Sequence, residues 1–316
     1  MKQVDLDLLR AIWVPLSYVA DENCTQSMKV WLSDGNYYIN NAPPDLSLFC
    51  LDKDELKKCL SLDAFRFSSH AAQTVHELEK TTAYEKLTSW RIIQAYYAAY
   101  FSAHAVLRFF GKSFSHLEQG HVDFLSGRCK SEAGYTPNLP SSYYLVESNP
   151  ITHNVSFLKQ RESHKDLWKC FLGLIIDLET QVLTLRASKE RLQELSAHFL
   201  DLKESLTNRG QFSSGSWLSN IRNEVNYKSL EGVWFPFSKA TPSFGNLLGK
   251  VRGWRGGEVD LGRPTLQGNE LERFFTTAFS VVDFGISLSL DYKRLTEKEG
   301  RRSAGFSRLV KLTAAA

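Results

Sequence analysis

The chain has 316 residues, of which 43% are hydrophobic and 23% charged, and its net charge at pH 7 is +3. This composition excludes a disordered or fibrous protein, and a mean hydropathy of −0.28 without a long apolar stretch argues against a membrane protein. Near the N-terminus, Asp5, Asp7 and Arg10 interrupt the apolar core that a secretory signal needs. We therefore expect a cytoplasmic protein with no membrane segment.

The sequence lacks the motifs of common metal and cofactor sites. Its five cysteines are odd in number and form no C-x-x-C pair, which excludes a disulfide framework and the usual zinc spacing. It contains no H-E-x-x-H motif, no dinucleotide-binding glycine motif and no complete phosphate loop. We expect reduced, mostly buried thiols, no metal site and no cofactor.

Residues 1–60 are interpreted as a small β-containing element. Within residues 30–39, Asp34 and Gly35 lie between two runs rich in β-branched and aromatic residues, which is typical of a β-hairpin. Pro43 and Pro44 follow and interrupt regular structure, since neither can donate to a strand ladder.

Residues 61–126 are predicted to form the first part of a helical core. An amphipathic helix begins near His70, and residues 84–110 then run without Gly or Pro and are apolar nearly all round. This pattern predicts a buried central helix that ends at Gly111. Four small residues would let another helix approach it closely: Ala98, Ala99, Ser102 and Ala103.

Residues 127–206 are predicted to be a loop followed by a long helical insertion. The loop, residues 127–156, is indicated by its glycines and prolines. Residues 165–206 have apolar side chains three or four positions apart, which predicts either one very long helix or a helical hairpin broken near Ala187 and Ser188.

Residues 207–316 are predicted to complete the helical core and to end in a basic tail. Ser216 is placed to cap a helix over residues 217–227, and a last helix spans residues 270–294. This part holds 16 Lys plus Arg against 10 Asp plus Glu, a net charge of +6. A basic field of this size is compatible with nucleic-acid binding and does not require it.

One helix and one short polar motif resemble a known family. Residues 95–111, Ala-Tyr-Tyr-Ala-Ala-Tyr-Phe-Ser-Ala-His-Ala-Val-Leu-Arg-Phe-Phe-Gly, are followed by Ser115-His116. They resemble the characteristic helix of the HEPN (higher eukaryotes and prokaryotes nucleotide-binding) family. That family carries a second motif on a late helix, either R-x(4 to 6)-H or R-x-x-A-D-Y. Residues 222–227, Arg-Asn-Glu-Val-Asn-Tyr, are similar to the second form, with Asn226 in place of its aspartate.

The resemblance implies a mainly α protein with a HEPN-like helical core, a small N-terminal β element and a long helical insertion. It implies an RNA- or nucleotide-binding protein, including a degenerate or atypical ribonuclease, in a toxin-antitoxin or phage-defence system with a partner protein. Homodimers are common in the family. A homodimer also agrees with the apolar surface of residues 165–206 and the small residues of the central helix, which together exceed what one helical body needs.

The polar motif supplies the candidate catalytic residues: Arg222, Asn223, Asn226 and Tyr227. On a helix Arg222 and Asn226 share a face, where the guanidinium can bind phosphate and the amide can orient a sugar or base. No histidine follows Arg222 in the chain, so the family's usual ribonuclease pair is incomplete there, and a tyrosine with a pKa of about 10 is a poor base.

Further nucleic-acid-binding residues are expected in the loop before the last helix: Arg252, Trp254 and Arg255, a mixture of cations and an aromatic that suits single-stranded nucleic acid. Three alternatives stay open. The protein binds RNA or a nucleotide without catalysis, it is an active ribonuclease with a base outside the motif, or it is a non-catalytic interaction subunit whose polar cluster is structural.

Overall fold

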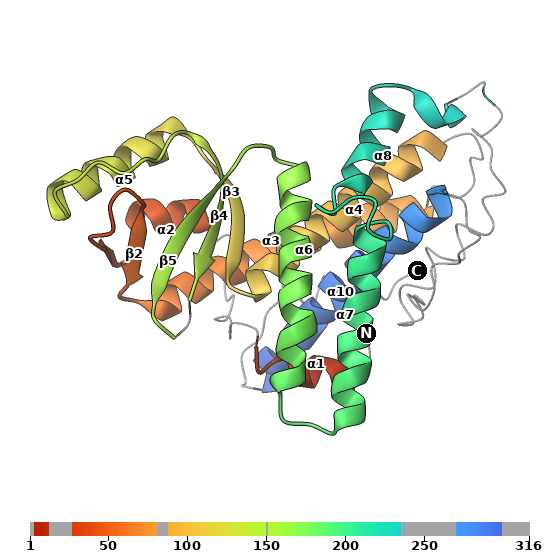
Figure 1. Cartoon of the computed structure of the whole chain (residues 1–316), viewed down its shortest axis with the longest axis horizontal. Coiled ribbons are helices and arrows are strands. Elements are labelled where there is room, and N and C mark those ends of the chain that lie inside the picture. Colours follow the sequence, from red (N-terminus) through yellow and green to blue (C-terminus); the bar gives the residue numbers. More distant parts are fainter. Residues whose placement is uncertain are drawn as a thin grey trace.

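The computed structural model describes residues 3–12, 27–80, 88–149, 151–234, 237 and 270–298. A helical body carries a five-stranded antiparallel sheet at one end (Figure 1). The fold is therefore mainly α with a small β element, as the sequence predicts.

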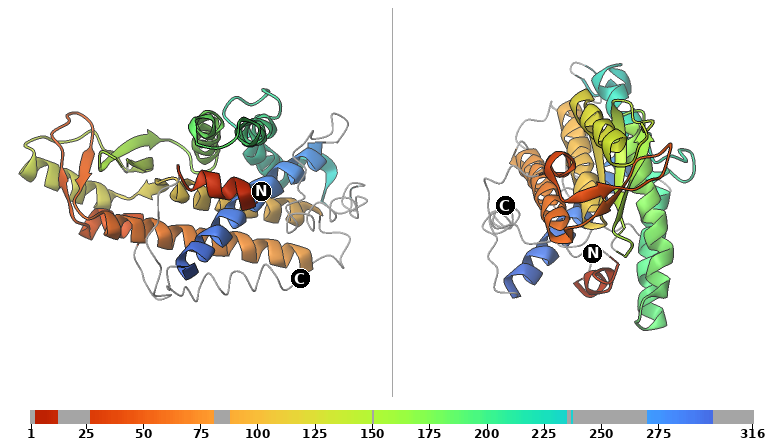
Figure 2. Two further views of the ribbon diagram at one scale, coloured as in Figure 1. Left: turned by 90° about the horizontal axis from the view of Figure 1, so that it is seen from below. Right: turned by 90° about the vertical axis from the view of Figure 1, so that its left-hand side faces the viewer.

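Three long helices form the centre of the helical body. α3 (Lys53–Lys80) and α4 (Thr88–Phe109) pack side by side, and α10 (Glu270–Lys298) lies across them (Figure 2). The predicted central helix is confirmed over α4, and residues 84–87 lie outside the described residues. α4 is buried except along one stripe, whose members are at least partly exposed: Trp90, Gln94, Tyr97, Tyr100 and Phe101.

The small residues of α4 do admit a close neighbour. A Cβ atom added to Gly285 of α10 would lie 3.0 Å from the Cβ of Ser102 and 3.3 Å from its backbone. Only a residue without a side chain fits this helix crossing without displacement. The close approach therefore fixes how α10 packs on α4.

We expect Gly285→Val to lower the free energy of unfolding by about 1–3 kcal/mol, because the added methyl groups force α10 away from Ser102. Urea denaturation would measure the loss. Gly173→Ala in α6 is the matched control, since nothing lies within 4 Å of its added Cβ and helix propensity alone should stabilise it by about 1 kcal/mol. Equal behaviour of the two variants would contradict the close crossing.

A helical hairpin also packs on the helical body. α6 (Lys165–Gln181) continues into a 3-10 turn, η2 (Val182–Thr184), and α7 (Lys189–Leu206) returns alongside it. The side chain of Ser188 accepts a hydrogen bond from the backbone N–H of Arg191 and so caps α7. Of the two forms predicted for residues 165–206, the hairpin is correct.

The sheet combines strands from two parts of the chain in the order β1-β2-β5-β4-β3, and all neighbours are antiparallel. The strands are β1 (Tyr37–Ile39), β2 (Ser47–Cys50), β3 (Lys112–Leu117), β4 (Ser142–Ser148) and β5 (Asn154–Gln160). Two helices, α2 (Met28–Asp34) and α5 (Gln119–Glu132), share a second hydrophobic core with the sheet. The sheet end thus has a core of its own.

Three local predictions are wrong. The helix expected to begin near His70 begins at Lys53, as α3. Residues 30–39 do not form a hairpin, because Met28, Trp31 and Leu32 are buried at helical spacing and the Ser27 side chain caps α2 at its start. Residues 127–156 are not one loop, because α5 continues into them and β4 and the start of β5 lie there.

The C-terminal part adds α8 (Trp217–Asn226), the short η3 (Leu230–Gly232) and α10, while α1 (Gln3–Leu9) packs against α10. Ser216 occupies the cap position of α8 but its side chain makes no capping hydrogen bond. Within α10, residues 270–296 are long and apolar enough to span a membrane by composition, yet 83% of the most apolar stretch is buried in the protein.

Candidate functional site

Three elements meet around the side chain of Arg222. They are α8, the exposed stripe of α4, and the connection from β5 to α6 (Figure 1). The residues in direct contact are Tyr96, Tyr97, His164 and Arg222, which we call the arginine–histidine site. Tyr96, Tyr97 and Arg222 lie in the two segments that resemble the family, whereas His164 comes from a third segment.

The sequence of α8 explains why Arg222 faces α4. Trp217, Ile221 and Val225 are buried at helical spacing and anchor α8 on the helical body. Arg222 follows Ile221 directly, so its side chain leaves α8 at the edge of this apolar face and is only 5% exposed. The polar motif lies in the second half of α8.

The Arg222 guanidinium makes three hydrogen bonds to side chains. Its Nη2 donates to the Tyr97 hydroxyl at 3.1 Å and to Nε2 of His164 at 2.8 Å, and its Nη1 donates to Oδ1 of Asn223 at 2.6 Å. Its Nε has no hydrogen-bond partner within the described residues. A buried guanidinium with an unused donor is a favourable place for a further acceptor such as a phosphate oxygen.

The contact with Arg222 determines the protonation state of His164. Arginine can only donate, so Nε2 of His164 must hold a lone pair, and Nδ1 carries the proton toward the Tyr96 hydroxyl 2.9 Å away. Burial, helped by the Arg222 charge, lowers the pKa of His164 from 6.5 to about 4. The imidazole is therefore neutral at pH 7, in the form that can accept a proton at Nε2.

Neighbouring groups hold His164 in place. Trp168 donates from Nε1 to the same Tyr96 hydroxyl at 3.1 Å, so the phenol is held from two sides. Asp166 accepts hydrogen bonds from the backbone N–H groups of Arg161 and Glu162, which fixes the turn that carries His164. Such second contacts are what keeps a catalytic imidazole in one orientation.

Aromatic rings surround the guanidinium. The Arg222 Cζ lies 5.5 Å from the ring centroid of Tyr96, 5.7 Å from that of Tyr97 and 5.2 Å from that of Tyr227. Tyr227 is 70% exposed, so the site opens to solvent on that side. An exposed ring beside a buried cation can stack on a base while the cation binds the phosphate.

The predicted site residues differ in whether they contact the Arg222 guanidinium. Arg222 and Asn223 are hydrogen bonded, and Tyr227 contacts the guanidinium with its ring. The side chain of Asn226 is half-buried and makes no hydrogen bond that we observe within the described residues. The second predicted group lies outside the described residues: Arg252, Trp254 and Arg255.

No sequence motif points to His164 as a partner of Arg222. The two residues are 58 positions apart and in reverse order, so no spacing rule joins them. The only local indication is that His164 directly precedes a strongly amphipathic helix, at a position where a side chain often lies at the surface of the fold.

The comparisons with known proteins give no relative. No protein-family model, curated protein or solved structure matches the chain. Within the part of the chain that the structure describes, no group of three or more His, Cys, Asp or Glu side chains could hold a metal ion. The function is therefore argued from the geometry of the site.

Proposed function

We propose that the protein binds RNA at the arginine–histidine site and cleaves it there. The observation that carries the proposal is the 2.8 Å contact between Nη2 of Arg222 and Nε2 of a neutral His164, at a surface lined by tyrosines. An anion-binding group and a proton acceptor next to one another are the two groups that RNA cleavage by its own 2′-hydroxyl requires.

The reaction follows from the donors and acceptors of the site. A phosphate of RNA takes the Nη2 hydrogen that points to His164, which releases the lone pair of Nε2. His164 then takes the proton of the 2′-hydroxyl, the 2′-oxygen bonds to phosphorus, and the bond from phosphorus to the 5′-oxygen breaks. The Tyr97 hydroxyl, held on the same guanidinium, supplies the proton that the departing 5′-oxygen needs. The products are a 2′,3′-cyclic phosphate and a 5′-hydroxyl.

The sequence resemblance to HEPN proteins agrees with this proposal and extends it. In that reading the arginine of the late helix keeps its place, and His164 supplies the base that residues 223–227 lack. The protein partner and the defence role stay proposals that rest on the resemblance, and the homodimer stays a proposal that rests on the resemblance and on the apolar residues of the sequence.

A second candidate, a non-catalytic interaction subunit, is favoured by one observation. Arg222 is 5% exposed and already satisfies Tyr97, His164 and Asn223, which is also how a structural arginine behaves. The two candidates differ in what the loss of Arg222 does.

We expect Arg222→Ala to weaken RNA binding about ten- to a hundredfold, the effect of losing hydrogen bonds from a charged group to phosphate. Fluorescence anisotropy with a short labelled RNA would measure the affinity at several salt concentrations, since phosphate contacts give a steep salt dependence. Lys169→Ala is the matched control because it removes one exposed positive charge from α6.

A thermal melt of the same variant separates the two candidates. If Arg222 is structural, Arg222→Ala should lower the free energy of unfolding by about 1–3 kcal/mol and leave the RNA affinity of the folded variant unchanged. That result would leave the interaction subunit as the better description.

A further inference from the structure

A pocket of about 250 Å³ opens where the sheet meets the helical body. α3 and α4 supply its inner side, β3 and β4 one wall, and α2 part of its rim. We call it the junction pocket. It shares one residue with the surroundings of the arginine–histidine site: the ring of Tyr100 lies 4.7 Å from that of His164 and 4.8 Å from that of His104, which lines the pocket.

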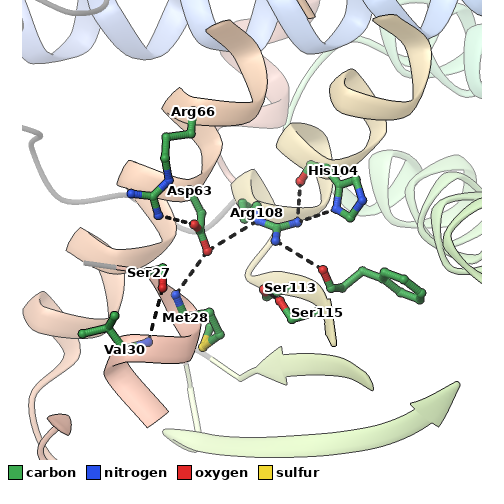
Figure 3. A network of polar contacts seen from close by, with 10 residues as sticks. Ser27, Met28, Val30, Asp63, Arg66, His104, Arg108, Ser113 and Ser115 are labelled. Atoms are coloured by element: carbon green, nitrogen blue, oxygen red, sulfur yellow. Dashed lines mark hydrogen bonds and ion pairs between the residues drawn. The ribbon is translucent and has the colours of Figure 1, made fainter. Parts of the chain in front are cut away.

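The floor of the junction pocket offers both an acceptor and donors. Asp63 and Arg108 point toward one another from facing helices (Figure 3), with 3.8 Å between Oδ2 of the carboxylate and Nε of the guanidinium. Arg108 is 2% exposed, and its Nε makes no hydrogen bond within the described residues. The floor therefore has a buried donor beside a buried acceptor.

His104 adds a second donor. Its Nδ1 accepts from Nη1 of Arg108 at 3.0 Å, so the proton of this imidazole is on Nε2, which has no partner that we observe among the described residues. Burial and the Arg108 charge lower the pKa of His104 well below 6.5, so the ring is neutral. The pKa of Arg108 is lowered to about 10 by burial, so the arginine keeps its charge at pH 7.

The charges of the floor decide which kind of group it accepts. Asp63 lies beside the buried Arg108 and also pairs with Arg66, which is outside the pocket lining, so an anion bound at Arg108 would meet the Asp63 carboxylate. A neutral group with an N–H next to a lone pair fits better, because it donates to Asp63 and accepts from Arg108 or His104. The polar edge of a nucleobase is such a group.

The walls and rim fit the rest of a nucleotide. Phe67, Tyr100 and Tyr143 line the pocket, and the Phe67 ring stacks on His104 with 4.4 Å between centroids. Aromatic walls favour a flat ring by stacking. Lys29 and His116 lie at the rim, where they can contact the ribose or its phosphate.

We propose that the junction pocket binds the base of a nucleotide, and that it selects the base next to the RNA phosphate held by Arg222. The selection of a base next to that phosphate rests on the proposed function. It is supported by Tyr100, which lines the pocket and also lies beside His164.

The test measures binding of the four nucleoside 5′-monophosphates and of inorganic phosphate by calorimetry, with Tyr143→Leu as the pocket variant. This change removes a wall ring and keeps apolar volume. Tyr38→Leu, on an exposed position of β1 in the same sheet, is the matched control. We expect at least one nucleotide to bind, phosphate alone not to bind, and affinity to fall tenfold or more in Tyr143→Leu only. His116→Ala is the second pocket variant if Tyr143→Leu does not fold.

Sequencing the ends of cleaved RNA tests the link to Arg222. We expect the pocket variant to lose the base preference of the wild type while Arg222→Ala loses cleavage. Nucleotide binding that is unaffected by either pocket variant, or binding of phosphate alone, would overturn the pocket proposal and leave the proposed function standing. Nucleotide binding that depends on Tyr143, in a protein that neither binds nor cuts RNA, would refute the proposed function and support the base-binding role of the pocket.

Discussion

Replacing His164 by alanine is expected to slow RNA cleavage by roughly 10²- to 10⁴-fold, the usual contribution of a general base. The variant keeps Arg222 and Tyr97, so KM should change little while kcat falls. Steady-state kinetics on a short RNA would separate the two constants. His121→Ala, which removes a histidine of α5 at the sheet end, is the control and should cleave normally.

The low pKa of His164 also predicts how RNA cleavage depends on pH. The pKa of His164 is about 4, so kcat/KM should stay high at neutral pH and fall only as the pH approaches 4, below the 6.5 of an ordinary histidine. Arg222→Gln removes a charge that holds this pKa down, so NMR titration should find it shifted upward. Full cleavage by His164→Ala, or an acid limb near 6.5 in the wild type, would contradict the assigned base.

The same pKa has a consequence for stability. It is lower in the folded protein than in the unfolded chain, so the unfolded chain takes up the proton first as the pH falls. The contribution of His164 to stability is therefore complete above about pH 6.5 and is lost between 6.5 and about 4.

The long helices could be predicted because their patterns repeat over many turns. α4 and α10 bury apolar residues nearly all round, and the periodic pattern of residues 165–206 allows a break near Ala187 and Ser188 as one of two forms. The short elements could not be predicted in this way. In α2, seven residues with four large apolar side chains fit a strand or a helix equally well, and burial of Trp31 against the sheet decides for the helix.

The strands after α5 could not be predicted from the sequence because prolines lie near them. The prolines of residues 127–156 predict a loop, but Pro137 and Pro140 precede β4 rather than interrupt it. β4 lies wholly between Pro140 and Pro150, and it pairs with a strand on each side. A proline-rich segment is therefore compatible with a central strand when its prolines lie in the connections.

Half of the candidate site could be predicted and half could not. Arg222 stands out as a buried-helix arginine within a motif, and Tyr97 lies on the helix that carries the resemblance. His164 and the junction pocket depend on which loop meets which helix. That information resides in the tertiary packing of α6 on α4, which no local pattern of the sequence encodes.

The largest loss of stability is expected for Arg108→Met, which breaks the buried pair between α3 and α4 at the junction pocket. The change leaves Asp63 buried at 6% exposure without its cation partner on α4 and leaves the carbonyl of Phe114 without its donor. Removing one partner of a buried pair lowers stability by about 3–5 kcal/mol. Denaturant unfolding followed by circular dichroism would measure the change.

A double variant tests whether the loss comes from the pair itself. Asp63 also accepts from the backbone N–H of Met28 and from Arg66 (Figure 3), so it holds the start of α2 against α3. After Arg108→Met the Asp63 carboxylate keeps the partly exposed Arg66 as a cation partner but has lost the buried one. Because Asp63→Asn removes this charge and keeps an oxygen for Met28, the double variant should be more stable than Arg108→Met alone. If the two substitutions simply add, Asp63 and Arg108 act independently, and the network does not join the sheet to the helices through their charges.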